Sequence, residues 1–169
     1  MKGTIVQTWF NSLKELYGEE PVYWAMDQVG WDKNRVITPV EDIDETIVNN
    51  FMERLSQKLN IPVGMIWRET GRKNIESFSK WFPSYFERHS LKGFLMMMDD
   101  VHIQLTRMIK GAKPPRLIAT ELQPNVITIE YRSHRGMFDY FLGLLEGSSK
   151  FFNETLEILE RQEDKEDDI

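Results

Sequence analysis

The chain has 169 residues, a net charge of −6, 41% hydrophobic residues and no cysteine, which suits one packed domain. The missing cysteines exclude disulfides, thiolate metal sites and haem attached through cysteine, and the negative charge argues against nucleic acid as a partner. No apolar run approaches the roughly 18 residues of a membrane helix, and the N-terminus lacks the apolar core of a signal peptide. We therefore expect a cytoplasmic domain without direct membrane contact, which includes the cytosolic domain of a membrane receptor.

Apolar residues at helical spacing dominate the first two-thirds of the chain. The first expected helix carries Ile5, Val6, Trp9, Phe10, Leu13 and Leu16, and Gly18 ends it. A short helix is expected over residues 21–28, and Asp44 can cap a third one with the stripe Ile47, Phe51, Leu55 and Leu59. Pro62 suits the first turn of the next helix. A further helical stretch carries Asn74, Phe78 and Trp81, and Pro83 ends it.

The second part of the chain combines helices with strands. Ser90 can cap a long helix that Gly111 stops, and residues 117–122 and 126–135 predict two strands joined around Pro124 and Asn125. A helix over residues 137–152 and a strand-like run over 156–159 follow. The predicted class is α+β: an N-terminal helical subdomain followed by a small antiparallel sheet packed with a further helix.

Several charged and small residues have simple predicted roles. Residues 160–168 hold six acidic residues and two basic ones, which predicts a solvated tail or linker. Asp99 and Asp100 are adjacent on a helix and are expected to be solvated, and His89 and His134 are expected to be exposed. Gly143 and Gly147 lie four apart on a helix, where they either admit a close neighbour or loosen the helix.

His102 is the first residue with possible chemistry. It follows Phe94 and Met98 on the apolar face of the long helix. A histidine in such a place is usually a core residue whose ring bonds a backbone carbonyl. Alternatively, a neutral imidazole in an apolar pocket is the commonest protein ligand of haem iron. One histidine does not decide between these interpretations.

The second feature is the run Tyr131, Ser133 and Arg135 at the end of the second predicted strand. Alternation places the three side chains on one face, in line with Ile127 and Ile129. They are either a solvated strand end or the polar rim of an apolar pocket. In the second case two hydroxyls and a guanidinium suit a pair of carboxylates, such as the two propionates of haem.

Four segments resemble the heme-nitric oxide/oxygen-binding (H-NOX) domain family: MKGTIVQTWF, WFPSYF, LMMMDDVHIQLTRMIKGA and YRSHR. The resemblance covers about residues 1–153, and YRSHR fits the family's Y-x-S-x-R pattern. That pattern is short and weak alone, but it is strong together with the upstream histidine. The resemblance implies non-covalent haem b between the two subdomains, with His102 as the iron ligand. It also implies that Tyr131, Ser133 and Arg135 bind the propionates.

The resemblance also assigns the residues around the ring and the gas. Pro115 and Ile5 match positions associated with haem distortion, and Phe78 and Leu144 match apolar pocket walls. Trp9, Asn74 and Tyr140 match the hydrogen-bonding trio of dioxygen-binding members, although sequence spacing alone cannot bring them together. A tyrosine hydroxyl favours dioxygen, because bound dioxygen becomes partly negative and carbon monoxide and nitric oxide polarise less.

The expected function is therefore a sensor of dioxygen, nitric oxide and carbon monoxide that is not an enzyme. By resemblance, nitric oxide weakens the iron–histidine bond, and the subdomains then rotate. Related domains are fused to methyl-accepting chemotaxis receptors or act beside histidine kinases or cyclic-dinucleotide enzymes. The alternatives are a haem enzyme such as a nitric oxide dioxygenase and a cofactor-free interaction module.

The expected domain spans residues 1–159, with a helical subdomain over about 1–60, a haem-enclosing subdomain over about 61–159 and the acidic tail over 160–169. Family members usually add a further strand after the acidic loop, whereas this chain ends at Ile169 within that loop. Whether the chain is cut short before that strand or the sheet lacks it stays open.

Overall fold

The computed structural model describes residues 1–87 and 90–162. Three helices come first: α1 (Gly3–Tyr17), α2 (Glu19–Gln28) and α3 (Glu45–Leu59). The middle of the chain forms α4 (Val63–Trp81), a short 3-10 helix (Pro83–Tyr85) and α5 (Leu91–Thr106). The last part forms β1 (Arg116–Gln123), β2 (Val126–Arg132) and α6 (Phe138–Phe152). The predicted α+β class is confirmed.

Side-chain caps start two of the helices where the sequence predicts them. The Asp44 carboxylate accepts a hydrogen bond of 2.8 Å from the Thr46 amide at the start of α3. The Ser90 hydroxyl accepts one of 3.1 Å from the Gly93 amide at the start of α5. Both bonds satisfy backbone donors that the helix itself leaves free. The two helical stretches expected on either side of residue 70 form one continuous helix, α4.

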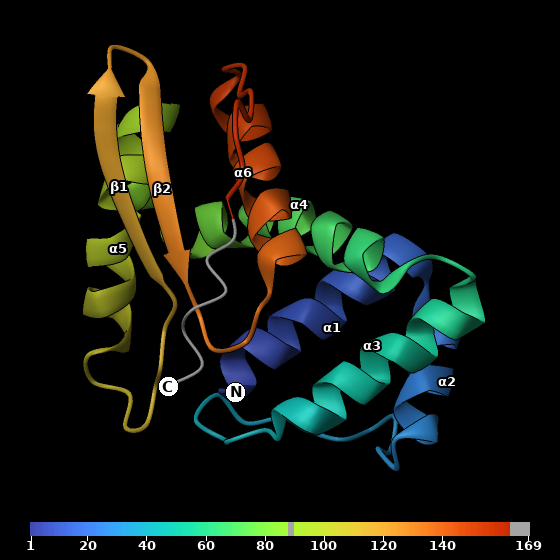
Figure 1. Cartoon of the computed structure of the whole chain (residues 1–169). Coiled ribbons are helices and arrows are strands. Elements are labelled where there is room, and N and C mark those ends of the chain that lie inside the picture. Colours follow the sequence, from blue (N-terminus) through green and yellow to red (C-terminus); the bar gives the residue numbers. More distant parts are fainter. Residues whose placement is uncertain (88–89, 163–169) are drawn as a thin grey trace.

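Two apolar clusters organise the molecule, and two helices contribute to both. The first cluster gathers α1, α2, α3, the beginning of α4 with Ile66 and Trp67, and Tyr140 of α6. The second gathers the end of α4, α5, the hairpin and α6. Figure 1 shows α5 and the hairpin on one side of the molecule and α1, α2 and α3 on the other, with α4 extending between them. α4 and α6 are therefore shared by both clusters.

The hairpin pairs β1 and β2 in antiparallel register, with Leu117 opposite Tyr131. Asn125 takes φ 67° in the connecting turn, a conformation that asparagine tolerates well. The inward row of β2, formed by Ile127, Ile129 and Tyr131, packs against the second cluster as predicted.

The predicted end of the second strand is wrong. β2 stops at Arg132, and the chain then turns around Ser133, where the Arg135 amide donates 3.2 Å to the Ser133 hydroxyl. Gly136 has φ 59°, a backbone conformation that an extended strand does not contain. Ser133 and Arg135 therefore follow the strand in a turn and do not continue its inward face.

The strand predicted over residues 156–159 is also wrong, because residues 154–162 form no helix or strand. Leu156 packs against the second cluster, whereas Leu159 is 71% exposed. An isolated strand has no partner for its backbone groups, and the sheet of the described residues contains only β1 and β2. Most of the predicted acidic tail, residues 163–169, and His89 lie outside the described residues. None of the described helices has the length and apolar character needed to span a membrane.

Glycines let α4 and α6 cross at close range. A Cβ atom at Gly143 would lie 2.0 Å from the Arg68 carbonyl oxygen, and one at Gly71 would lie 2.3 Å from the Tyr140 carbonyl oxygen. Gly147 approaches Arg72 in the same way, at 2.7 Å from its carbonyl oxygen. Of the two roles left open for Gly143 and Gly147, the structure selects close approach. The crossing brings the side of α4 that carries Asn74 against the start of α6, which carries Tyr140.

Candidate functional site

His102 lies in the second half of α5 with its ring half-buried. Its Nδ1 atom lies 2.8 Å from the Met98 carbonyl oxygen, one helical turn earlier. A carbonyl oxygen only accepts hydrogen bonds, so the ring proton must be on Nδ1. The Nε2 atom therefore keeps its lone pair, and it has no hydrogen-bond partner among the described residues. This is the arrangement in which a ligating histidine is held by its other nitrogen.

The surroundings of His102 keep its ring neutral. Burial lowers the pKa of His102, against the opposing effects of the Met98 carbonyl and the Asp99 carboxylate. A lowered pKa means that the imidazole is uncharged at neutral pH, as metal ligation requires. Among the described residues, His102 makes no hydrogen bond or ring contact with Tyr131 or Tyr140.

Of the three predicted propionate-binding residues, Tyr131 is the one that lies on the sheet. Its ring stacks on Phe141 of α6 at 4.9 Å with an interplanar angle of 9°. Burial raises the pKa of Tyr131, although the Ser133 hydroxyl, the Arg135 charge and the Met137 backbone lower it. The phenol is therefore protonated at neutral pH and can donate a hydrogen bond. Ser133 and Arg135 thus lie in the turn just after the strand that carries Tyr131, close enough to affect its phenol.

Arg135 connects this turn to the helical part of the chain. Its Nε donates 2.8 Å to a carboxylate oxygen of Glu45 in α3, and one terminal nitrogen, Nη1, donates 2.8 Å to the Lys113 carbonyl. Glu45 also faces the exposed His134 ring at 3.4 Å and the N-terminal amine at 3.7 Å. Burial raises the pKa of Glu45, but the hydrogen bond and charge of Arg135 outweigh it and keep the pKa below its ordinary value. The Nη2 atom has no partner among the described residues, so it can still bind an acid group.

The remaining predicted ring contacts lie around the two clusters. Pro115 is half-buried and directly precedes β1. Ile5 packs against the first cluster, Phe78 against the second and Leu144 against both. Ile5, Phe78 and Leu144 are therefore apolar packing residues, and Leu144 contacts both clusters.

Asn74 and Tyr140 form a buried polar pair across the crossing of α4 and α6. The Asn74 amide nitrogen donates 2.8 Å to the Tyr140 hydroxyl. Asn74 is fully buried and Tyr140 is 8% exposed. Burial raises the pKa of Tyr140 to about 12, against the lowering effects of Asn74 and Trp9. The phenol is thus a protonated donor at neutral pH, in an interior where hydrogen bonds count strongly.

Trp9 completes the group from α1. Its ring lies 5.5 Å from the Tyr140 ring in an edge-to-face arrangement, with an interplanar angle of 77°. The indole N–H is close enough to lower the pKa of Tyr140, yet it completes no well-aligned hydrogen bond within the described residues. A buried N–H without an acceptor is rare in proteins. An unsatisfied donor beside a phenol fits a small polar ligand at this place.

Two residues of this group were not predicted from the sequence. The Ser12 hydroxyl donates 2.5 Å to the Asn74 amide oxygen. The Trp67 ring lies 4.9 Å from Trp9 and 5.9 Å from Tyr140, edge-to-face with both. A helical signal was available for each, because Ser12 lies three residues after Trp9 and Trp67 lies seven before Asn74.

Asp99 has a different environment from the predicted one. Its carboxylate accepts hydrogen bonds of 2.8 and 2.7 Å from the Arg116 guanidinium and one of 3.0 Å from the Leu117 amide. The Arg116 hydrogen bond and then the Leu117 amide lower the pKa of Asp99 to about 2. Asp99 therefore ties α5 to the start of β1, one helical turn before His102, whereas Asp100 is exposed as expected.

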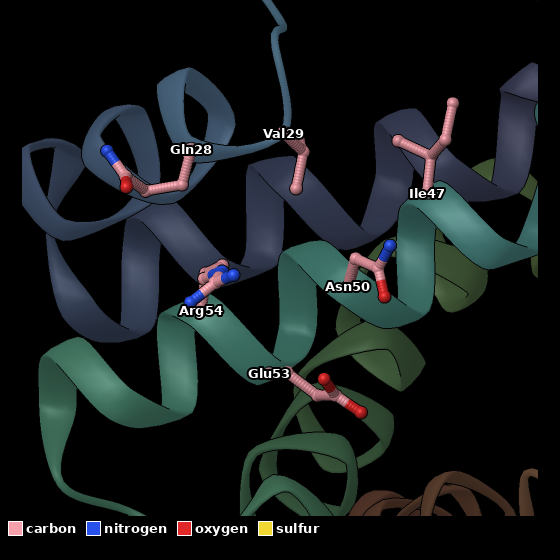
Figure 2. A pocket seen from close by; sticks show the side chains of 6 residues that line it. All are labelled: Gln28, Val29, Ile47, Asn50, Glu53 and Arg54. Carbon is pink, nitrogen blue, oxygen red and sulfur yellow. The ribbon is translucent and has the colours of Figure 1, made fainter.

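Two surface pockets lie apart from these residues. One, of about 210 Å³, lies between the end of α2 and α3 and is lined by Gln28, Val29, Ile47, Asn50, Glu53 and Arg54 (Figure 2). The other, of about 500 Å³, lies beside the crossing of α4 and α6 and includes the charged residues Glu69, Arg72 and Glu146. Neither contains a predicted site residue.

Comparison with known proteins finds one family and several solved structures. Residues 2–160 match the family model described as Haem-NO-binding. A mutant H-NOX domain of T. tengcongensis is 54% identical with TM-score 0.91, over 98% of this chain and 91% of that one. An oxygen-binding H-NOX domain related to soluble guanylate cyclases, solved as its oxygen complex, is 55% identical with TM-score 0.88, over 98% and 89%. A Cs H-NOX variant carrying 4-cyano-L-phenylalanine is 54% identical with TM-score 0.92, over 98% and 90%. None of the curated proteins compared with the chain matches it.

Proposed function

Because the chain belongs to the Haem-NO-binding family, whose H-NOX domains are gas sensors and not enzymes, we propose that it senses dioxygen, nitric oxide and carbon monoxide at haem. The cofactor is non-covalent haem b, since the chain has no cysteine to attach it. Residues 1–159 form the sensor domain, with a helical subdomain over about 1–60 and a haem-enclosing subdomain over about 61–159. Residues 160–169 form an acidic tail or linker.

The observation that carries this proposal is the state of His102. Its Nδ1 proton is directed to the Met98 carbonyl, its Nε2 atom is free among the described residues, and burial keeps the ring neutral. When bound, haem supplies an iron atom that takes diatomic gases and makes dioxygen partly negative. His102 would hold that iron through Nε2, and the Met98 carbonyl would hold the ring of His102.

The acid groups of haem would bind at the turn after β2. Tyr131 and Ser133 offer hydroxyl donors, and Arg135 keeps Nη2 unpaired among the described residues. Hydrogen bonds between a guanidinium and a carboxylate are about twice as strong as neutral ones. Pro115 and Ile5 would press on the ring, and Phe78 and Leu144 would line it.

Tyr140 would favour dioxygen over carbon monoxide. Its phenol is protonated up to a pKa of about 12 and already accepts a hydrogen bond from Asn74. Its own proton is therefore available to a partly negative dioxygen molecule. Carbon monoxide and nitric oxide gain less from this donor but need only the iron, so all three gases are expected to bind.

The bound state would then be passed to a signalling partner or a fused domain. A gas shifts a two-state equilibrium only by binding one state more tightly than the other. α4 and α6 contribute to both apolar clusters, so they are the elements that would carry such a difference.

Spectroscopy of the purified protein tests the proposal. Ferrous protein should show a stable dioxygen spectrum in air that reverts under argon, without turnover of nitric oxide and reductant. His102→Gly should lose haem unless imidazole is supplied, while His134→Gly, which alters an exposed histidine, should keep it. A colourless wild-type protein, or full haem retention by His102→Gly without imidazole, would refute the assignment.

A further inference from the structure

Ser12 differs from the other buried serine and threonine residues in the described helices. Thr8, Thr70 and Ser148 each donate to the carbonyl four residues earlier in their own helix. This local bond is the usual way for a helix to satisfy a buried serine or threonine. Ser12 instead donates across to α4, to the Asn74 amide oxygen at 2.5 Å, and it is only 2% exposed.

This bond joins three helices in one chain of donors and acceptors. Ser12 of α1 donates to Asn74 of α4, and Asn74 donates to Tyr140 of α6. Both ends of the Asn74 amide are thereby used inside the protein, where Asn74 is fully buried and no solvent replaces a lost partner.

The orientation of the Asn74 amide decides what the Tyr140 phenol can do. In the present orientation the amide N–H₂ faces the phenol, which accepts from it and keeps its own O–H free. If the amide turned over, its oxygen would face the phenol and take that proton, and the proton of the Ser12 hydroxyl would lose Asn74 as its acceptor. The Tyr140 hydroxyl could then no longer donate to a ligand, although every side chain would still be in place.

We propose that Ser12 is a positioning residue for dioxygen, whose hydroxyl holds the Asn74 amide in the orientation that leaves the Tyr140 O–H free. This role rests on the proposed gas-sensing function and adds a residue to it. Ser12 touches neither the gas nor the haem in this role. It acts through Asn74 alone, so its effect should depend on the gas.

The test compares Ser12→Ala with Ser12→Thr and Ser148→Ala. Ser148→Ala is a matched control, because Ser148 is 1% exposed and bonds only its own helix. In Ser12→Ala, dioxygen should leave the ferrous protein roughly 3- to 10-fold faster, the effect of one buried neutral hydrogen bond, and carbon monoxide affinity should stay within about twofold. Ser12→Thr should restore the slow rate and Ser148→Ala should retain it. If Ser12→Ala does not accumulate, Ser12→Cys keeps the volume with a much weaker donor.

A second readout observes Asn74 directly. In the carbon monoxide complex, the side-chain amide protons of Asn74 should exchange slowly with solvent in wild type and Ser12→Thr. They should exchange faster, with shifted resonances, in Ser12→Ala. Equal loss of both gases, absence of rescue by threonine, or an unchanged Asn74 amide would overturn the role of Ser12. A wild-type protein that binds carbon monoxide but no dioxygen would overturn the proposed function instead, and the amide spectra would still decide whether Ser12 holds Asn74.

Discussion

Opposing influences set the chemistry of the Tyr140 phenol. Burial raises its pKa to about 12, while the Asn74 and Trp9 donors work in the other direction. The phenol therefore keeps its proton across the physiological range and can only act as a donor toward a negatively polarised ligand. The aromatic edges of Trp9 and Trp67 hold the ring itself.

Replacing Tyr140 with Leu should weaken dioxygen binding and leave carbon monoxide almost unaffected. The lost donor to a partly charged ligand is worth about 1.5–3 kcal/mol, or roughly 10- to 150-fold in affinity. Stopped-flow dissociation of dioxygen from the ferrous protein, beside a carbon monoxide titration, measures both effects. Tyr140→Phe keeps the ring and should behave similarly. An unchanged dioxygen dissociation rate would mean that the phenol does not contact the gas.

The sequence predicts these residues unevenly. His102 and the row ending at Tyr131 stand out because local periodicity places them on apolar faces. Trp9, Asn74 and Tyr140 come from three helices, and only the family resemblance groups them before the structure is known. Ser12 shares a helix face with Trp9, but a buried serine in a helix normally bonds its own backbone, so the sequence alone does not show that it bonds Asn74.

Among the elements, the crossing of α4 and α6 positions Asn74 against Tyr140. Gly143 faces the Arg68 backbone and Gly71 faces the Tyr140 backbone, so the helices are as close as their main chains allow. The Arg68 guanidinium binds Glu146 across the same crossing, with Nε at 2.9 Å from the carboxylate. Asn74 reaches Tyr140 only because this distance is short.

Gly143→Ala should therefore destabilise the protein. Its Cβ would meet the Arg68 carbonyl oxygen at 2.0 Å, and overpacking against backbone costs about 1–3 kcal/mol. At an uncrowded helix position the same substitution would stabilise the protein by about 1 kcal/mol. The sign of the change in the free energy of unfolding therefore shows whether Gly143 is in close contact with α4. Urea unfolding measures it, with Gly64→Ala as the control. A Cβ at Gly64 would meet only the movable end of the Asp139 side chain, at 2.5 Å. A stabilised Gly143→Ala would contradict the close crossing.

The link between α5 and β1 should make stability depend on pH. The folded pKa of Asp99 is lowered to about 2 by Arg116 and the Leu117 amide, whereas the unfolded value is about 3.9. The link therefore contributes fully above pH ~4 and is lost as pH falls toward the folded pKa. Asp99→Asn should be less stable than wild type at neutral pH, and the difference should shrink between about pH 4 and pH 2. Urea unfolding of both proteins at several pH values measures this, and a constant difference would contradict it.

Element boundaries show where local patterns fail. Helix caps such as Asp44 and Ser90 are local signals, and both were predicted correctly. The alternation after Tyr131 suggested a longer strand, but β1 begins at Arg116, which pairs with Arg132, so no partner remains for Ser133. The apolar run over residues 156–159 likewise lacks a neighbouring strand in the described chain. Pairing is a property of the whole sheet, and a single segment does not reveal it.

At the scale of the molecule, Arg135 joins the turn after β2 to α3. Its partner Glu45 is the first residue of α3, and the Lys113 carbonyl holds the guanidinium from the other side. Arg135 is 17% exposed and Glu45 33%, so solvent screens the pair only in part. The residue proposed to bind a propionate is thus also a link between the two parts of the molecule.

Two substitutions separate these roles of Arg135. Arg135→Ala removes both the proposed bond to a propionate and the link to Glu45. Because a bond to a charged group is worth about 1.5–3 kcal/mol, haem should transfer to an acceptor protein roughly 10-fold faster or more. Glu45→Gln removes only the charge that Arg135 binds in α3, so the free energy of unfolding should fall by up to about 1 kcal/mol while haem loss stays slow. Haem transfer and urea unfolding, measured on the same preparations, distinguish the two effects. Fast haem loss from Glu45→Gln would mean that the link to α3 itself retains the cofactor, and slow loss from Arg135→Ala would place the propionates elsewhere.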